Sequence, residues 1–193
     1  YLDFAILDNG SLYRAYAYFH NQGLSGIKIV QAINELAFIP TKDDTNILYQ
    51  NNEITSGIRN EEIAKTASRL SALSETRELL IDIQKNFMEG KNIIADGRDM
   101  GTVVFPEADL KIFLDASAKV RAERRYLELQ KRGQEVNMRD LIADIELRDL
   151  KDRTRTLSPL IPADDSIIID SSVMSLEEVL SFTKKLVKKE LNK

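Results

Sequence analysis

Four short apolar runs, each followed or ended by an aspartate, recur along the chain. They are Phe4–Leu7, Ile93–Ala95, Lys111–Leu114 and Ile167–Ile169. Nearly continuous apolar runs of this length are typical of strands that are buried on both faces, as in parallel sheets. Segments with helical spacing of apolar residues separate the runs, and this alternation implies right-handed crossovers. The pattern therefore predicts an α/β fold with one parallel sheet and helices on both of its faces.

Several expected helices carry recognisable start and stop signals. Leu12, Ala15, Tyr16 and Phe19 have the spacing of one buried helical face, which ends near Gly23. Further helices are expected at residues 24–35, from Asn60 through the stripe Ile63, Ala67 and Leu70, and from Ser74 through Leu80, Ile83 and Phe87 to Gly90. A capping side chain followed by acidic residues, as at Asn60, favours a helix start.

The second half of the chain predicts three more helices. Ser117 can cap a helix that runs to about Arg132, and another helix is expected at 137–156. Ser175 and Glu178 have the spacing of a capping box for the C-terminal helix. The apolar residues of that helix are expected to pack inward; they are Val179, Phe182, Leu186 and Val187.

The segment from Phe38 to Arg59 breaks the helical pattern. Ile47–Tyr49 and Glu53–Thr55 flank Asn51-Asn52, which tolerates positive φ, so a small antiparallel hairpin is expected. The chain is accordingly interpreted as a single domain, 1–193, with a hairpin-containing insertion at about 36–90 and an arginine-rich segment at about 121–157. No low-complexity linker or repeat of 20 to 50 residues divides it.

Composition narrows the possible functions. The formal charge of −4 argues against a nucleic-acid surface, and no stretch reaches the roughly 20 apolar residues that cross a bilayer. Zero cysteines exclude thiolate chemistry and fit a reducing compartment, so we expect a soluble cytoplasmic protein. Neither a catalytic Ser/His/Asp arrangement nor a His/Cys metal set is evident, and no metal-ligating residue is assigned.

The polar turn Asp96-Gly97-Arg98-Asp99 follows the second run, at the carboxyl end of a predicted central strand. Open α/β sheets bind their ligands at this edge. Arg14 falls in the first turn of its helix, where a nearby anion would offset its unfavourable position against the helix dipole. Arg148, Asp152 and Arg155 share one face of the helix at 137–156. Solvated or mutually paired charges remain the alternative explanation for each of these features.

An acidic protein that collects arginines in one cleft suits a compact polyanion, because guanidinium groups match phosphate oxygens bidentately. Phosphoryl transfer depends mainly on positioning and charge stabilisation. The residues alone leave four classes open: a nucleotide kinase, a kinase for another nucleoside monophosphate or small acceptor, a nucleotide-binding protein without catalysis, and an α/β domain with scattered surface arginines.

The run Ile94–Pro106, continued by Lys111–Ser117, closely resembles the bacterial cytidylate kinases. Leu7–Arg14, Arg148–Arg155 and Pro159–Ala163 support the resemblance, which covers essentially the whole chain. It implies a P-loop nucleoside monophosphate kinase fold, with 36–90 as the monophosphate-binding insertion and 121–157 as the lid. The implied activity is transfer of the γ-phosphoryl group of ATP, with Mg²⁺, to CMP or dCMP.

The resemblance also implies roles for individual residues. Ser68, Arg77 and Asp99 would read the cytosine, and Asp152 with Arg148 would hold the sugar. Gly10 would also lie against the substrate. Arg14, Arg98 and Arg155 would grip the acceptor phosphate as the catalytic residues, and Arg124 and Arg125 would approach the donor side. The implied partners are CMP, dCMP and ATP, with no nucleic acid and no membrane, in a monomeric protein.

Two departures from the family pattern stand out. Asn9 occupies a position where relatives typically carry Ser or Thr, which puts one fine contact in question. The sequence has no G-x-x-x-x-G-K-[ST] phosphate loop, which relatives carry near their start, and Tyr1-Leu2-Asp3 resembles the end of a helix. We therefore expect the chain to be part of a longer protein and, as written, to lack kinase activity. If the gene itself lacked the loop, a binding protein without catalysis would be favoured.

Overall fold

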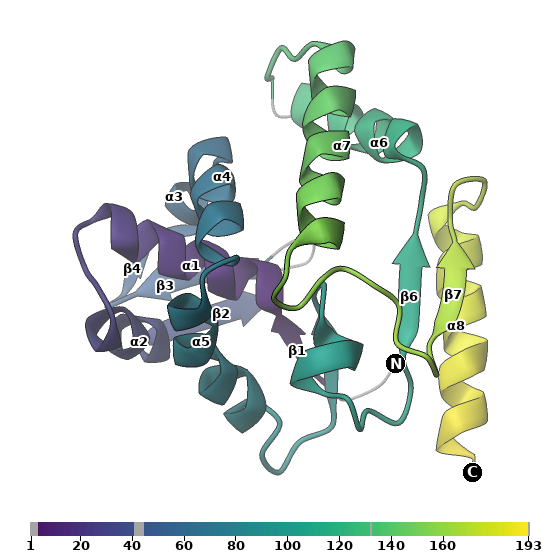
Figure 1. The fold of residues 1–193 in the computed structure, drawn as a ribbon, viewed down its shortest axis with the longest axis horizontal. Coiled ribbons are helices and arrows are strands. Elements are labelled where there is room, and N and C mark those ends of the chain that lie inside the picture. The colour runs from purple at the N-terminus through teal and green to yellow at the C-terminus, as the bar shows by residue number, and fades with distance from the viewer. Residues whose placement is uncertain (1–3, 41–44, 132, 193) are drawn as a thin grey trace. The chain divides into compact units, whose positions relative to one another are not determined.

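The computed structural model describes residues 4–40, 45–131 and 133–192 (Figure 1). The chain divides into two compact units, residues 1–97 and 98–193, and each unit is described by itself. The predicted helix end at Tyr1-Leu2-Asp3 and the helix limit at Arg132 lie outside the described residues.

The first unit contains a parallel pair of strands, β1 (Ala5–Asp8) and β5 (Ile93–Asp96). Their register places Asp8 beside Asp96, so both predicted strands end in an aspartate at the same edge. Asp8 also caps helix α1 (Asn9–Asn21), because its carboxylate accepts a hydrogen bond from the Ser11 backbone N–H at 2.9 Å. The strand-to-helix turn predicted from the sequence is therefore confirmed.

The unit also holds a three-stranded antiparallel sheet in the order β2 (Leu36–Pro40), β3 (Thr45–Tyr49) and β4 (Asn52–Glu53). The predicted hairpin is confirmed, but its turn lies one residue earlier than expected. Gln50 and Asn51 have the positive φ values, 49° and 66°. Strand β2 was not predicted, and Thr55 begins the short helix α3 (Thr55–Ile58) instead of continuing the strand.

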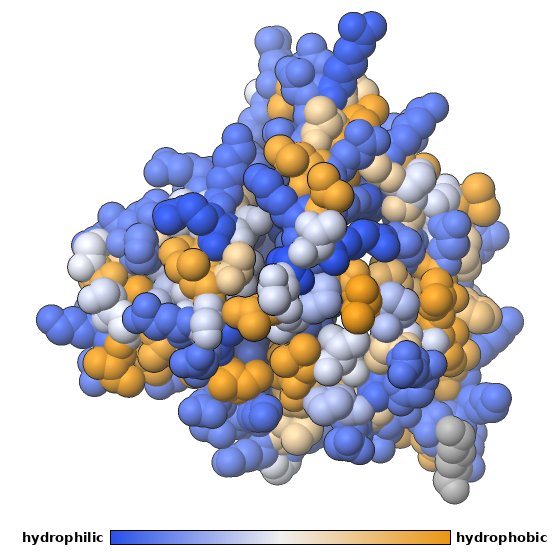
Figure 2. All heavy atoms as spheres, in the orientation of Figure 1, coloured by the Kyte–Doolittle hydropathy of each residue, from blue (hydrophilic) through white to orange (hydrophobic). Residues whose placement is uncertain are grey.

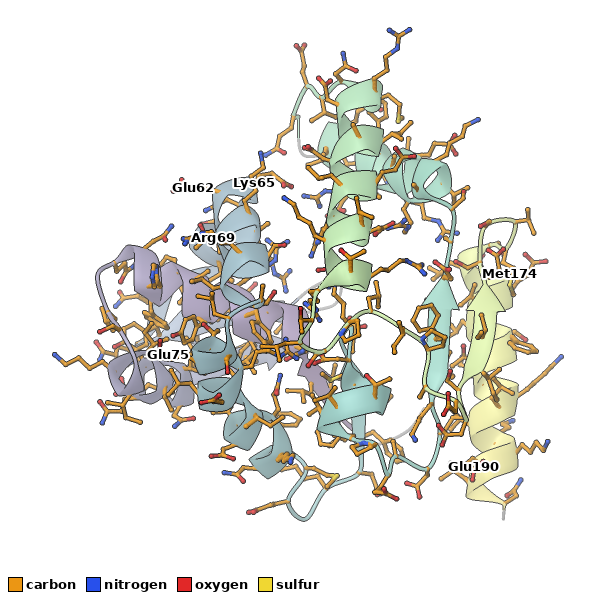
Figure 3. The ribbon with its side chains drawn as sticks, viewed as in Figure 1. Glu62, Lys65, Arg69, Glu75, Met174 and Glu190 are labelled. Atoms are coloured by element: carbon orange, nitrogen blue, oxygen red, sulfur yellow. The ribbon has the colours of Figure 1, made fainter. Side chains whose placement is uncertain are left out.

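Helices surround one apolar core in this unit. Helix α1 packs against α4 (Glu61–Leu70) and α2 (Ile27–Asn34), and α5 (Ser74–Asn86) completes the set. The predicted stripe Ile63, Ala67 and Leu70 is buried, while Glu62, Lys65 and Arg69 follow one another along the exposed face of α4 (Figure 3). The periodicity of the sequence thus identified the buried face of α4 correctly.

The second unit contains the parallel pair β6 (Ile112–Asp115) and β7 (Ile167–Asp170). Helices α6 (Ala118–Lys131) and α7 (Met138–Thr154) pack side by side, and α8 (Leu176–Leu191) follows β7 and runs back along it (Figure 1). A π-helical turn, η1 (Met100–Val104), follows the Asp96–Asp99 turn and was not predicted. This five-residue turn is too short for its apolar residues to show a periodicity in the sequence.

The predicted α/β class with parallel strands is confirmed. Within the described residues, the parallel strands form two separate pairs, β1 with β5 and β6 with β7. The capping box of Ser175 and Glu178 is present. One prediction for α8 was wrong: the Phe182 side chain is 42% exposed, whereas Val179, Leu186 and Val187 are half-buried. Nothing among the described residues covers Phe182 closely enough to bury it.

Candidate active site

Each unit carries part of the predicted site. Gly10, Arg14, Ser68 and Arg77 belong to the first unit. The second unit contains Arg98, Asp99, Arg124, Arg125, Arg148, Asp152 and Arg155.

In the first unit, the beginning of α1 is held by its cap. The Ser11 hydroxyl and backbone N–H both donate to the Asp8 carboxylate. A Cβ at Gly10 would lie 3.2 Å from Asp8 Oδ1, so a side chain there would press on the capping carboxylate. Arg14, one turn further along, donates from Nη1 to the Asn60 carbonyl at 3.4 Å. The guanidinium of Arg14 is therefore directed toward the N-terminal end of α4.

Arg77 is held in place by two groups. Its Nη1 donates to the Ser71 carbonyl at 3.0 Å, and its guanidinium carbon lies 5.9 Å from the centroid of the Tyr13 ring. A guanidinium at this distance over an aromatic face is attracted by the ring quadrupole. Ser68 is half-buried on α4, and its carbonyl accepts a hydrogen bond from the Ser71 hydroxyl at 2.9 Å. Tyr13, which the sequence analysis did not single out, thus positions a predicted cytosine-reading residue.

In the second unit, three arginines surround one buried carboxylate. Arg98 Nε donates to Asp152 Oδ2 in a short ion pair, and Arg155 Nη1 lies 3.7 Å from Asp152 Oδ1. Arg148 Nε lies 3.9 Å from Asp152 Oδ2. The Asp152 side chain is only 7% exposed. The predicted common face of Arg148, Asp152 and Arg155 is therefore present, and Arg98 joins it from outside α7.

Asp99 lies immediately before η1 and is 3% exposed. Its backbone carbonyl accepts from the Val103 and Val104 N–H groups at 2.9 and 3.2 Å. The backbone at Asp99 is thus held by η1. Arg98, its neighbour in sequence, belongs to the group around Asp152.

Arg124 and Arg125, which were expected on the donor side, contact other groups of the second unit. Arg124 donates to the Ser171 carbonyl at 2.7 Å and to its hydroxyl at 3.2 Å, and Arg125 pairs with Glu128 at 2.9 Å. Arg124 therefore ties α6 to the segment after β7. Arg125 remains on the surface of its own helix, with a partner three residues away.

A pocket of about 510 Å³ lies at the carboxyl ends of β6 and β7. It is lined by Asp115, Ala116, Ser117, Ala118, Arg121, Asp149, Arg153, Ile168, Asp170 and Ser172. Pockets of this size suit small ligands, and the carboxyl edge of parallel strands is where α/β proteins bind them. Hydrogen bonds from the Ser172 hydroxyl and backbone N–H hold the pKa of Asp170 below its usual value.

Two ion pairs beside this pocket were missed by sequence reasoning. Arg121 Nη1 donates to Asp149 Oδ1 at 2.9 Å, and a second, short contact joins Nη2 to Oδ2. The bidentate pair raises the pKa of Arg121. Arg153 Nη2 lies 3.5 Å from Asp115 Oδ2. Charged residues on helices are common, so the sequence offered no signal that these four would pair across elements.

Another missed contact is the buried hydrogen bond from Gln84 Nε2 to Asn9 Oδ1, 2.5 Å long. Asn9 is 5% exposed and Gln84 is 2% exposed. The departure at Asn9, which the sequence analysis identified, is thus accommodated by a partner on α5. The family pattern could have suggested a polar partner for Asn9 but not its position.

Within the described residues, no group of three or more His, Cys, Asp or Glu side chains could hold a metal ion. No helix in the same part of the chain is long and apolar enough to cross a membrane.

A buried carboxylate surrounded by arginines, in an α/β chain with parallel strands, is an arrangement that suits a phosphorylated small molecule as ligand. Comparison of the sequence with known protein families identifies the family of this chain. The cytidylate kinase family model matches residues 1–189. The chain belongs to the cytidylate kinase family and is accordingly an ATP-dependent nucleoside monophosphate kinase, as the sequence resemblance implied.

Curated relatives agree with this assignment. The cytidylate kinase of Mannheimia succiniciproducens is 40% identical, over 93% of this chain and 83% of the relative. The cytidylate kinase of Yersinia enterocolitica is 42% identical, over 93% of this chain and 80% of the relative. The cytidylate kinase 1 of Haemophilus influenzae is 40% identical, over 93% of this chain and 80% of the relative.

Proposed function

We propose that the protein transfers the γ-phosphoryl group of ATP to CMP or dCMP, with the acceptor phosphate held by Arg14, Arg98 and Arg155. The observation that carries the proposal is the group of guanidiniums around Asp152. Phosphoryl transfer needs positioning and charge stabilisation more than covalent chemistry from the protein. Arginines held by a buried carboxylate supply both.

The cytosine is assigned to Ser68, Arg77 and Asp99. Asp99 would accept a hydrogen bond from the exocyclic amine, which uracil replaces with a carbonyl oxygen. Uracil would therefore leave a carboxylate that is 3% exposed without its donor, and a site built around such a bond rejects the analogue that lacks it. The sugar hydroxyls are assigned to Asp152 and Arg148, and Gly10 leaves room for the substrate at the start of α1.

The donor nucleotide is assigned to the neighbourhood of Arg124 and Arg125, which lie on α6. Mg²⁺ usually binds through substrate phosphates with few protein ligands, so we assign it to the ATP phosphates and to no residue described here. We also propose that the protein is a monomer in the cytoplasm. Size-exclusion chromatography with light scattering would test the monomeric state.

The decisive assay is ATP-coupled phosphotransfer to CMP, dCMP and UMP by the product of the complete gene. We expect CMP and dCMP to be phosphorylated far faster than UMP. CMP binding without turnover would instead favour a nucleotide-binding protein, and turnover of UMP equal to that of CMP would remove the role of Asp99.

The variant Asp99→Asn tests, in the same assay, whether Asp99 recognises the cytosine. We expect kcat/KM for CMP to fall by roughly 10- to 100-fold, as a lost hydrogen bond to a charged group costs about 1.5–3 kcal/mol, and the preference for CMP over UMP to narrow. Asp109→Asn, an exposed aspartate ten residues further on, is the matched control and should leave both values unchanged. An Asp99→Asn enzyme with the wild-type CMP preference would contradict the assignment.

A further inference from the structure

The Asp152 carboxylate contacts groups that the sugar-binding role does not require. A sugar hydroxyl needs one acceptor oxygen, yet both oxygens of Asp152 are within 4 Å of guanidinium nitrogens. Arg98 and Arg155, which are assigned to the phosphate, are two of the three partners. Asp152 therefore contacts the phosphate-gripping arginines directly.

The charges of this group fit the acceptor. Within this group of four side chains, guanidiniums outnumber carboxylates by three to one. A phosphate monoester carries about −1.5 to −2 near pH 7. Without Asp152 the three cations would repel one another, most strongly at Arg155, whose side chain is only 10% exposed.

The backbone fixes Asp152 in turn. The Asp152 carbonyl accepts from the Leu160 N–H at 2.8 Å, and Arg155 Nε donates to the Ser158 carbonyl at 2.7 Å. Ser158 has a φ of 48°, in the left-handed region, where the chain turns back after α7. The carboxylate thus lies on the anchored end of α7, while Arg98 and Arg148 have side chains that are 38% and 45% exposed.

We propose that Asp152 is a positioning residue for phosphate binding: its buried carboxylate holds Arg98, Arg148 and Arg155 in the arrangement that receives the acceptor phosphate, in addition to any contact with the sugar. The inference rests on the proposed function. According to this proposal, phosphate binding requires the Asp152 carboxylate, although the carboxylate and the phosphate are both negatively charged.

The test uses inorganic phosphate, which has no sugar, and the variant Asp152→Asn in the product of the complete gene. Removing a negative charge beside an anion site should strengthen phosphate binding by Coulomb's law alone. Positioning predicts the opposite sign. We expect phosphate affinity, measured by calorimetry or as competitive inhibition against CMP, to fall about tenfold. Asp144→Asn, with the same charge change on an exposed part of α7, should leave affinity nearly unchanged.

Phosphate binding by Asp152→Asn that equals or exceeds the wild type would overturn the proposal. A wild-type protein that does not phosphorylate CMP would overturn the proposed function instead, so the two failures are distinguishable.

A second measurement needs no variant, in case Asp152→Asn fails to fold. Nitrogen-15 NMR of the nucleotide-free wild-type protein reports solvent exchange at arginine Nε–H groups. We expect the Arg98 Nε–H, which donates to Asp152, to exchange at least tenfold more slowly than that of the exposed Arg139. Equal exchange rates would show that Asp152 does not hold Arg98 and would also overturn the proposal.

Discussion

Helix α1 carries Arg14, and helix α7 carries Arg148 and Asp152; these residues are proposed to bind the substrate, but the two helices are held by different contacts. Helix α1 buries eight residues, among them Leu12, Tyr16 and Phe19, in the core of the first unit. Among the residues of α7, only Asp152 is buried, while Leu147 and Leu150 are 50% and 60% exposed. Hydrophobic side chains are visible on the surface of α7 in Figure 2. Helix α7 is held by its packing against α6 together with ion pairs of Arg148, Asp149, Asp152 and Arg153.

The difference separates a rigid support from an adjustable one. Apolar burial stabilises by roughly 25 cal/mol per Å² and depends little on salt. Ion pairs that are partly exposed contribute about 1 kcal/mol or less and weaken as salt screens them. Arg14 thus lies on a helix that moves only at high energetic cost. Arg148 lies on α7 and Arg155 directly follows it, so we expect the placement of both to depend more on ligand charge and ionic strength.

The largest effect is expected from the core of the first unit. Leu80 is fully buried there, so Leu80→Ala should lower the free energy of unfolding by about 2–5 kcal/mol through lost burial and a residual cavity. Urea denaturation gives the value. Leu73→Ala, at a position that is 48% exposed just before the same helix, should cost less than about 1 kcal/mol. Equal losses for the two variants would contradict an apolar core as the main support.

A smaller, salt-dependent effect is expected from the second unit. Asp149→Asn removes the partner of Arg121 and should cost up to about 1 kcal/mol at low salt, because both side chains are partly exposed. Hydrogen exchange should show faster opening of α6 and α7, and 1 M salt should reduce the difference from the wild type. Asp144→Asn is the control. If the loss in free energy of unfolding of Asp149→Asn did not change with salt, the Arg121–Asp149 pair would act through packing and not through charge.

The smallest effect is expected where the ion pair faces solvent. Lys111 donates to both oxygens of Asp165, and this contact holds the pKa of Asp165 below its usual value. A carboxylate with a lowered folded-state pKa stabilises the fold above its ordinary pKa and loses that contribution as the pH falls through the lowered one. Asp165→Asn should therefore be slightly less stable than the wild type at pH 7 and indistinguishable from it at an acidic pH below the lowered pKa.

Thermal unfolding at the two pH values measures this effect. The neighbouring exposed Asp164 provides the control variant, Asp164→Asn, which should show no such dependence. A deficit for Asp165→Asn that persists at the lower pH would rule out the ion pair as its cause.

Local sequence patterns predicted many of the strands and helix starts. The four strands and the caps at Asn60 and Ser175 lie where the sequence predicted them, because period, propensity and capping act within a few residues. Strand β2 and the turn η1 were missed, since one depends on pairing with β3 and the other is too short to show a period. Phe182 was assigned to the interior although its burial depended on neighbours that the sequence could not place.

For the site, the sequence by itself determined the family and the residues that match its motif, since a long contiguous run such as Ile94–Pro106 is specific. Only the tertiary structure decided how those residues are supported. It brought Arg98 to Asp152, fifty-four positions away in sequence, and Tyr13 beneath Arg77. Contacts between distant residues depend on how whole elements pack, and no local pattern of charge or hydrophobicity encodes which arginine a given carboxylate will meet.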